Sequence, residues 1–313
     1  MWREKNRQIE VSAEEIKTGL YALEKLGVAE IVLSGGNPLL RDDIDEIVRY
    51  ASQRFITTIY DNGSVASKKI DVLRNADFVA ISLDTLDEEK NDYMRGVRGA
   101  YKEAINAVEK LHVEGVSVGV APTISQLNLY EMEGFTRYFT DKGIPVWYAV
   151  YSHDDVEGQL FGIGKKNDEL EITDKAAMVK LCDSLMKMKK ERNGIFITGK
   201  MLTALKHLFL TGERTWKCRA LQNFLMVNPQ GQVSGCHLCE PVAAVTELPE
   251  QWNSLRFNAL RAKYSACEKC TYACYLFYSI HSGVRGGIEI LQDQFKNARS
   301  LVSTAHEIKN VVA

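Results

Sequence analysis

Short β-rich runs alternate with longer helix-like segments from residue 12 to about residue 150, and this alternation constrains the fold more than any other feature. The runs are "EIVLS" (30–34), "FITTIY" (55–60), "FVAISL" (78–83), "VSVGVAPTI" (116–124) and "VWYAV" (146–150). The segments between them have the apolar spacing of amphipathic helices, and Ser12 is expected to cap the first one. Repeated strand–helix units predict a parallel sheet, open or closed, that binds ligands at the carboxyl ends of its strands.

Small or polar residues follow several of these runs, where the strands should end. They are Ser34, Gly35, Gly36 and Asn37; Asp61, Asn62, Gly63 and Ser64; Ser82 and Asp84; Thr123 and Ser125; and Ser152 and His153. One polar strand end is an ordinary turn, whereas several on the binding face of a parallel sheet indicate a site. We therefore expect a ligand at this edge.

The rest of the chain changes character. Residues 151–173 are expected to form a loop, and helices are expected at about 174–192 and 198–211. The segment 213–280 combines short strands, a turn at Asn228-Pro229-Gln230-Gly231 and most of the cysteines, and the tail from about 286 to 310 is helix-like.

Cysteine usage is uneven along the chain. Residues 1–181 contain none, and Cys182 stands alone in a helical segment where core packing explains it. The remaining cysteines are Cys218, Cys236, Cys239, Cys267, Cys270 and Cys274. Since the charged N-terminus has no export signal, this clustering favours metal ligation over disulfides.

The spacing of these thiols does not decide which metal centre they bind. The turn between Cys218 and Cys236 folds the two thiols toward each other, and "CEKCTYAC" can present two or three more to one point. Four thiolates from two segments make a tetrahedral zinc site or a [4Fe–4S] cluster. Cys236-x-x-Cys239 and Cys267-x-x-Cys270 together have zinc-ribbon spacing.

Composition excludes several classes of partner. The 39 Lys and Arg against 41 Asp and Glu give a formal charge of −2, so we expect neither nucleic acid nor an anionic membrane as partner. No window approaches the roughly 18 apolar residues of a membrane span. The expected location is the cytoplasm.

Several segments resemble radical S-adenosylmethionine (SAM) enzymes. "LSGGNPLLR" is similar to the Gly-Gly-Glu-Pro motif of that family, and "CRALQNFLMVNPQGQVSGC" resembles the opening of its SPASM or twitch auxiliary-cluster domains. "YDNGS", "ISLDT", "APTISQLN" and "CEKCTYAC" follow in the family's order, so the resemblance covers nearly the whole chain.

The resemblance implies an α/β fold, a partial (β/α)6 TIM-like barrel with five of six strands present and the first strand missing. It places this barrel at residues 1–200, a small Cys-rich SPASM/twitch-like domain at 201–285 and a helical tail at 286–313.

The same resemblance implies a SAM site. The backbone of Gly35 and Gly36 and the side chain of Asn37 would meet the ammonium group of SAM, and Pro38 would fix the turn. Asn37 stands where the family usually has Glu, so this contact should be weaker. The ribose and substrate pocket would be lined by Asn62, Gly63, Ser82, Asp84, Thr123 and Ser125. The catalytic residue itself is not identified.

One departure concerns the catalytic cluster. The family holds it with a C-x-x-x-C-x-x-C loop after the first strand, and this sequence lacks that loop. Either the sequence is truncated at its N-terminus or the protein has lost this cluster, and we favour truncation. A second, catalytic [4Fe–4S] cluster is thus expected only in an N-terminally complete chain, and the chain as given should lack activity.

The expected function is that of a radical SAM maturase or modifying enzyme. SAM would yield a 5′-deoxyadenosyl radical that abstracts hydrogen from a peptide or small-molecule substrate, and an auxiliary [4Fe–4S] cluster on the clustered cysteines would accept an electron or anchor the substrate. Flavodoxin or ferredoxin would supply electrons. The alternatives are a noncatalytic iron–sulfur electron-transfer or binding protein and a zinc-binding TIM-like protein.

Overall fold

The central element of the fold is a parallel sheet, seen in a computed structural model that describes residues 10–152, 169–268, 272–283 and 286–290. Its strands, in spatial order, are β1 (Glu30–Leu33), β2 (Ile56–Asp61), β3 (Phe78–Ile81), β4 (Val118–Val120), β6 (Val146–Trp147) and β8 (Ile195–Phe196). All neighbours run parallel, as Glu30↔Ile56 and Thr58↔Phe78 show. The predicted α/β fold with a parallel sheet is confirmed.

The expectation of five strands is too low for this sheet. The sixth strand in the described part of the chain, β8, pairs with β6 through Val146↔Ile195 and Trp147↔Phe196. Its two residues are too few to show a period, so no pattern in the sequence predicted this strand. A small extension beyond the main sheet pairs β5 (Thr123–Ile124) with β7 (Ala149–Val150).

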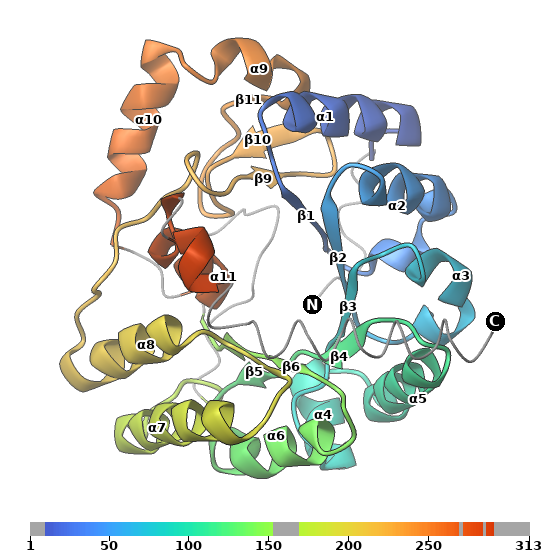
Figure 1. Cartoon of the computed structure of the whole chain (residues 1–313), viewed down its shortest axis with the longest axis vertical. Coiled ribbons are helices and arrows are strands. Elements are labelled where there is room, and N and C mark those ends of the chain that lie inside the picture. Colours follow the sequence, from blue (N-terminus) through green and yellow to red (C-terminus); the bar gives the residue numbers. More distant parts are fainter. Residues whose placement is uncertain (1–9, 153–168, 269–271, 284–285, 291–313) are drawn as a thin grey trace.

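Helices cover the outside of the sheet (Figure 1), whereas α11 lies on its concave side. The α-helices are α1 (Ala13–Lys25), α2 (Ile44–Ser52), α3 (Ile70–Leu73), α4 (Glu88–Arg95), α5 (Ala100–Val113), α6 (Met132–Thr140), α7 (Lys175–Glu191), α8 (Gly199–Thr211), α9 (Leu248–Gln251), α10 (Leu255–Ser265) and α11 (Ala273–Ile280). Short 3₁₀ turns are η1 (Pro38–Leu40), η2 (Ala66–Lys68), η3 (Leu129–Glu131) and η4 (Val245–Glu247). The helices expected at 174–192 and 198–211 are confirmed as α7 and α8.

Ser12 begins α1 as predicted. Its hydroxyl accepts a hydrogen bond from the backbone N–H of Glu15 at 3.3 Å, and the Glu15 carboxylate accepts one from the backbone N–H of Ser12 at 2.9 Å. This reciprocal capping box satisfies two backbone donors at the start of the helix.

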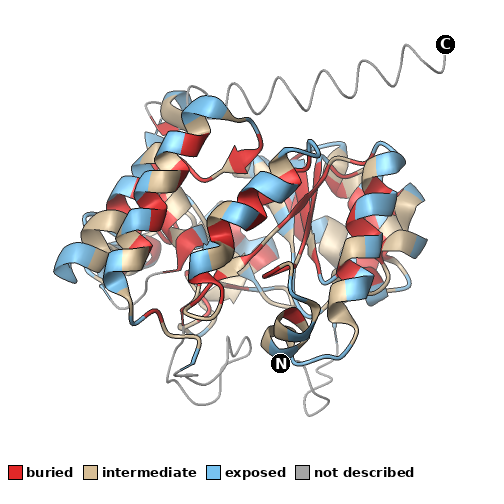
Figure 2. Ribbon diagram, turned by 90° about the horizontal axis from the view of Figure 1, so that it is seen from below, coloured by how far each residue is buried: buried red, intermediate tan, exposed pale blue. Residues whose placement is uncertain are grey.

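The larger core lies between the sheet and its outer helices. Figure 2 shows buried residues along the strands and on the inward faces of the helices that pack over them. Val79 and Ile81 of β3 are fully buried, as are Val108 and Leu111 of α5. Cys182 lies in this core, as its isolated position in the sequence predicted, and burial raises the pKa of its thiol to about 12.

A second core joins the N-terminal helix to the cysteine-rich segment. Leu20 and Leu23 of α1 pack with Val245, Leu248 and neighbouring apolar residues. Gly19 lets the two parts approach, because a Cβ there would lie 2.7 Å from Cγ1 of Val245. This segment contains the antiparallel sheet of β9 (Met226–Val227), β10 (Gln232–Ser234) and β11 (Ala243–Ala244), whose β9–β10 turn is the predicted one.

Some predictions fall outside the described residues. They are His153 and most of the loop 151–173, Cys270, and most of the tail 286–313. In the part of the chain that the structure describes, no helix is long and apolar enough to cross a membrane.

Candidate active site and thiol cluster

The loop after β1 is open at Gly35. This residue has a φ of 141°, which favours glycine, and no atom lies within 4 Å of a Cβ built there. Asn37 then caps η1, since its Oδ1 accepts a hydrogen bond from the backbone N–H of Leu39 at 2.9 Å, and Pro38 takes the first position of that turn. The backbone of the loop is therefore accessible at Gly35, and Asn37 and Pro38 fix the conformation in which the chain enters η1.

Asn37 also ties this loop to the one after β2. Its Nδ2 donates to Oδ1 of Asn62 at 3.0 Å and to Oγ of Ser64 at 3.0 Å. The same Asn62 oxygen accepts the backbone N–H of Ser64 at 2.9 Å. Two of the polar strand ends singled out in the sequence thus meet at the carboxyl edge of the sheet.

Gly63 lies against α5. A Cβ there would lie 2.7 Å from Cα of Ala104, and its φ is 87°. The residue was expected to line a ligand pocket, and the structure gives it a packing contact with the backbone of α5. Only glycine permits this close approach of two backbones at a positive φ.

Asp61 is a buried carboxylate among the polar strand ends noted in the sequence, although it was not one of the residues expected to line the SAM pocket. It is 3% exposed, its Oδ1 accepts the backbone N–H of Gly63 at 2.6 Å, and its Oδ2 has no hydrogen-bond partner among the described residues. Burial raises its pKa to about 6, against the lowering effect of the Gly63 N–H. A charged side chain directly after an apolar strand was the available signal.

Asp84 is the centre of a buried network at the end of β3. Its carboxylate forms an ion pair with Arg95 at 2.7 Å and accepts the backbone N–H of Thr123 at 2.8 Å. Nδ2 of Asn128 donates to the backbone oxygens of Asp84 and Thr123, at 2.8 and 3.0 Å. Asp84 therefore joins the segment after β3 to the start of β5.

The remaining predicted pocket residues differ in accessibility. Ser125 is 1% exposed, and its backbone N–H and its hydroxyl donate to Oδ1 of Asn128 at 2.8 and 3.3 Å. Ser82 is half-buried, and its backbone N–H donates to the carbonyl of Asp61 at 2.8 Å. The structure brings the predicted residues to one edge of the sheet, but buries Asp84 and Ser125 in their own hydrogen bonds.

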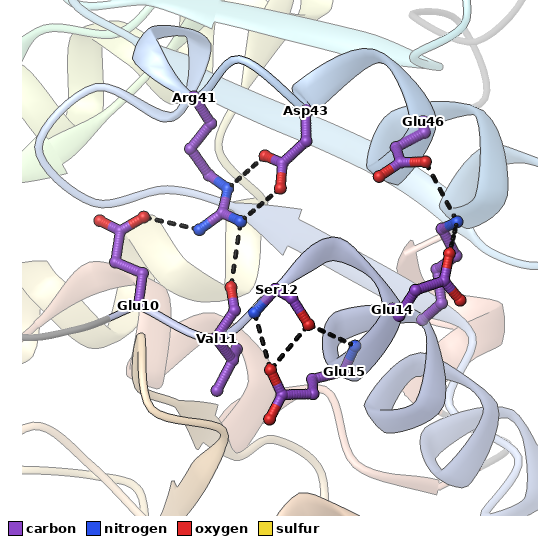
Figure 3. A network of polar contacts seen from close by, with 9 residues as sticks. Glu10, Val11, Ser12, Glu14, Glu15, Arg41, Asp43 and Glu46 are labelled. Carbon is purple, nitrogen blue, oxygen red and sulfur yellow. Dashed lines mark hydrogen bonds and ion pairs between the residues drawn. The ribbon is translucent and has the colours of Figure 1, made fainter.

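Arg41 anchors the C-terminal end of the loop after β1 through several polar contacts (Figure 3). Its guanidinium binds both oxygens of Asp43 at 2.8 Å, the Glu10 carboxylate at 2.6 Å and the backbone carbonyl of Val11 at 3.1 Å. The fork of Arg41 thereby lowers the pKa of Asp43. The sequence interpretation missed Arg41, although it ends the motif segment "LSGGNPLLR".

Thiols gather in the second core. Cys218 is buried, the sulfurs of Cys236 and Cys239 lie 3.6 Å apart, and Cys267 follows α10. Burial raises the pKa of Cys218, the backbone N–H of Ala220 lowers it, and the nearby Cys267 and Cys239 raise it further. We call Cys218, Cys236, Cys239 and Cys267 the thiol cluster. Among the described residues, no three potential ligands already surround one point as a metal site.

Cys274 is an exposed residue of α11. Burial raises the pKa of Tyr60, and the nearby Cys274 and Glu30 contribute to the same direction. The hydroxyl of Tyr278 donates to Oε2 of Glu30 at 2.8 Å, which attaches α11 to β1. Cys274 thus lies close enough to Tyr60 and Tyr278 to affect their pKa values, and its role as a metal ligand stays a prediction.

Solved structures share this fold. The chain resembles native anSMEcpe with bound AdoMet and the Cp18Cys peptide, with a TM-score of 0.62, 12% identity and coverage of 96% of this chain and 92% of that one. It resembles Streptococcus suis SuiB bound to S-adenosylmethionine with a TM-score of 0.63, 18% identity and coverage of 82% and 62%. These similarities show the fold.

Curated relatives match at higher identity. The AdoMet-dependent heme synthase of Methanosarcina barkeri (strain Fusaro) is 25% identical over 282 residues, which cover 83% of this chain and 79% of the relative. The sporulation killing factor maturation protein SkfB of Bacillus subtilis (strain 168) is 27% identical over 169 residues, covering 53% and 39%. For several other relatives the match spans only about a third of their length, 35 to 37%.

The family assignment rests on the N-terminal part of the chain. Residues 2–138 match the sequence model of the Radical SAM superfamily. This range includes the loop 35–38, the loop 62–64 and the Asp84 network described above. The chain thus contains a region, residues 2–138, that matches the radical SAM superfamily.

Proposed function

We propose that this chain is a radical SAM maturase or modifying enzyme that acts on a peptide or a small molecule. SAM and a [4Fe–4S] cluster are the cofactors of its family, and together they supply a 5′-deoxyadenosyl radical that abstracts a hydrogen atom from an unactivated carbon. The observation that carries the proposal is the contact of Asn37 with Asn62 and Ser64, because it joins two motif segments of the family domain at the edge where parallel sheets bind ligands.

Gly35 and Gly36 would receive the amino-acid end of SAM on their backbone. The open space at Gly35 fits this role, since any side chain there would occupy the approach. Asn37 and Pro38 would fix the conformation of the loop, and Arg41 would bind its C-terminal end to Glu10 and Val11. Asn62, Ser82 and Thr123 are accessible enough to touch the ligand, whereas Gly63, Asp84 and Ser125 would position them.

The thiol cluster would hold the auxiliary [4Fe–4S] cluster. Thiolates are the ligands that iron–sulfur clusters require, and the four thiols come from segments that share one core. Cys270 stays a candidate outside the described residues. We assign no ligand role to Cys274, because its neighbours are Tyr60 and Tyr278.

The wider setting follows from this assignment. We propose a barrel at residues 1–200, an auxiliary-cluster domain at 201–285 and a tail at 286–313. A flavodoxin or ferredoxin would deliver electrons. We propose the cytoplasm as the location, because a reducing compartment keeps the clustered thiols free for metal binding. SkfB is a maturation protein and one solved neighbour binds a peptide, which supports a peptide substrate; the heme synthase relative supports a small-molecule one.

Formation of 5′-deoxyadenosine tests the proposal. The protein, together with any segment that its gene encodes before Met1, is reconstituted with iron and sulfide and incubated with SAM and dithionite. We expect 5′-deoxyadenosine from the wild type, and little from Gly36→Val, whose side chain blocks the backbone. Gly134→Val, at an exposed helical position with no atom within 4 Å, is the matched control. No product from a protein with a loaded catalytic cluster would favour the noncatalytic electron-transfer alternative.

A zinc protein is the second candidate, and one distance supports it. Two thiolates on one tetrahedral zinc lie about 3.8 Å apart, given Zn–S bonds of about 2.3 Å. The separation of 3.6 Å between Cys236 and Cys239 is close to that value. Stoichiometric zinc without iron in the purified protein would decide for this candidate.

A further inference from the structure

A row of aromatic rings leads from the thiol cluster to the concave face of the sheet. His237 stands between Cys236 and Cys239 in sequence, and its Nδ1 lies 2.8 Å from the hydroxyl of Tyr275. The ring of Tyr275 stacks on Phe224 with centroids 4.9 Å apart and an angle of 7°. Phe224 is followed by Tyr278 at 6.2 Å.

The far end of this row reaches the main sheet. Tyr278 donates its hydroxyl hydrogen to Glu30 on β1, the strand that leads directly into the loop at Gly35. Tyr275 and Tyr278 stand three positions apart on α11, so one helix carries both rings and fixes their separation. Stacked rings in contact are also a favourable packing arrangement.

We propose that Tyr275, Phe224 and Tyr278 form an electron path between the thiol cluster and the concave face of the sheet. Electronic coupling falls steeply with the gap between donor and acceptor, so rings in contact transfer an electron faster than an aliphatic gap of the same length. The proposal rests on the proposed function, because the thiol cluster must hold a redox-active iron–sulfur cluster.

The step that this path would serve is an oxidation. A carbon radical formed on the substrate loses one electron, the oxidised auxiliary cluster gains it, and the substrate loses one proton to water. The products are a closed-shell molecule and a cluster reduced by one electron. Glu30, the first residue of β1, accepts the hydroxyl hydrogen of Tyr278 at the sheet end of the path.

Light-driven electron transfer tests the path without any turnover. The full chain is loaded anaerobically with iron and sulfide, and a thiol-reactive ruthenium photosensitiser is attached to the exposed Cys274, which lies near Tyr60 and Tyr278. Thiolates bound to iron are protected, and peptide mass mapping verifies the labelled position. A laser flash then transfers one electron from the excited ruthenium complex to the cluster, whose absorption bleaches.

We expect the cluster to be reduced several-fold more slowly in Tyr275→Leu and in Phe224→Leu than in the wild type, at equal iron content and equal reduction potential. Tyr275→Phe keeps the ring and loses the hydroxyl, and it should keep the rate of the wild type. If Tyr275 acted only through the hydrogen bonds of its hydroxyl, Tyr275→Phe would slow the transfer as much as Tyr275→Leu. Tyr21→Leu, on exposed α1, is the control. Equal rates in all folded, loaded variants would overturn the path alone. A wild-type chain that binds only zinc would overturn both the path and the proposed function.

Discussion

The side-chain amide of Asn37 donates to Oδ1 of Asn62 at 3.0 Å, so the loop after β1 is held to the loop after β2 by one residue. The same amide bonds Ser64, and the oxygen of Asn37 caps η1. Asn37 therefore has a structural role, because its side chain connects the two loops of the site. An asparagine can both donate and accept, whereas the glutamate usual in the family accepts only.

Asn37→Asp tests this connection. The aspartate keeps the acceptor for Leu39 but loses both donors and places a carboxylate oxygen against Oδ1 of Asn62. We expect a loss of about 1–3 kcal/mol in the free energy of unfolding at neutral pH, measured by urea denaturation. Asn193→Asp, an exposed position, adds the same charge and should change little. Equal stability of both variants would contradict the role of Asn37.

Gly63→Ala tests the contact with α5. Alanine at a φ of 87° costs about 1–2 kcal/mol in backbone strain, and its Cβ would lie 2.7 Å from Cα of Ala104. Gly27→Ala has a φ of 75° with no atom within 4 Å, so it measures the strain alone. We expect Gly63→Ala to lower the free energy of unfolding clearly more than Gly27→Ala. A similar loss in the two variants would show that the helix moves aside without cost.

Asp61→Asn tests the buried carboxylate. Its folded pKa of about 6 lies above the ordinary value of 3.8, so the folded protein binds the proton more tightly than the unfolded chain. Its contribution to stability is therefore fully present at low pH and is lost as the pH rises through 6. Between pH 4 and pH 7, the unfolding free energy of the wild type should fall by about 2 kcal/mol relative to Asp61→Asn.

The control for this pH dependence is Asp71→Asn, whose side chain is 92% exposed. It should leave the pH profile of the wild type unchanged. Parallel profiles for the wild type and Asp61→Asn would mean that Asp61 is charged in the folded protein at pH 5.

Single cysteine variants test which thiols bind the metal. Cys239→Ala and Cys218→Ala should lose bound metal, because both belong to the thiol cluster. Cys274→Ala should keep the metal content of the wild type, because Cys274 lies beside Tyr60 and Tyr278. Metal analysis of the purified variants decides between them. Full loading of Cys239→Ala together with loss in Cys274→Ala would reverse the assignment.

Much of the fold could be predicted from periodicity. The strands β1, β2, β3, β4 and β6 and the helices α7 and α8 lie where the apolar runs and spacing placed them, since their apolar residues pack into the core. The strand β8 was missed because two residues carry no period. The pairing of α1 with the cysteine-rich segment in one core joins residues more than 200 positions apart, which no local pattern reports.

The candidate site was predicted less completely. Polar strand ends were located correctly, because parallel strands share one carboxyl edge. Which of them are buried was not predictable: Asp84 and Ser125 are covered by partners on other elements, Arg95 and Asn128. Likewise, the spacing of "CEKCTYAC" allowed Cys274 to join Cys267 but did not report that α11 also brings Cys274 near Tyr60 and Tyr278.

The most direct test of the central claim is the metal content of the full chain purified without oxygen. If the thiol cluster holds a [4Fe–4S] cluster, the wild-type protein should be brown and contain about four iron and four sulfide per chain from this site. Cys218→Ala should lose them. A colourless protein with one zinc per chain and no iron would contradict the claim and leave the chain without its auxiliary redox centre.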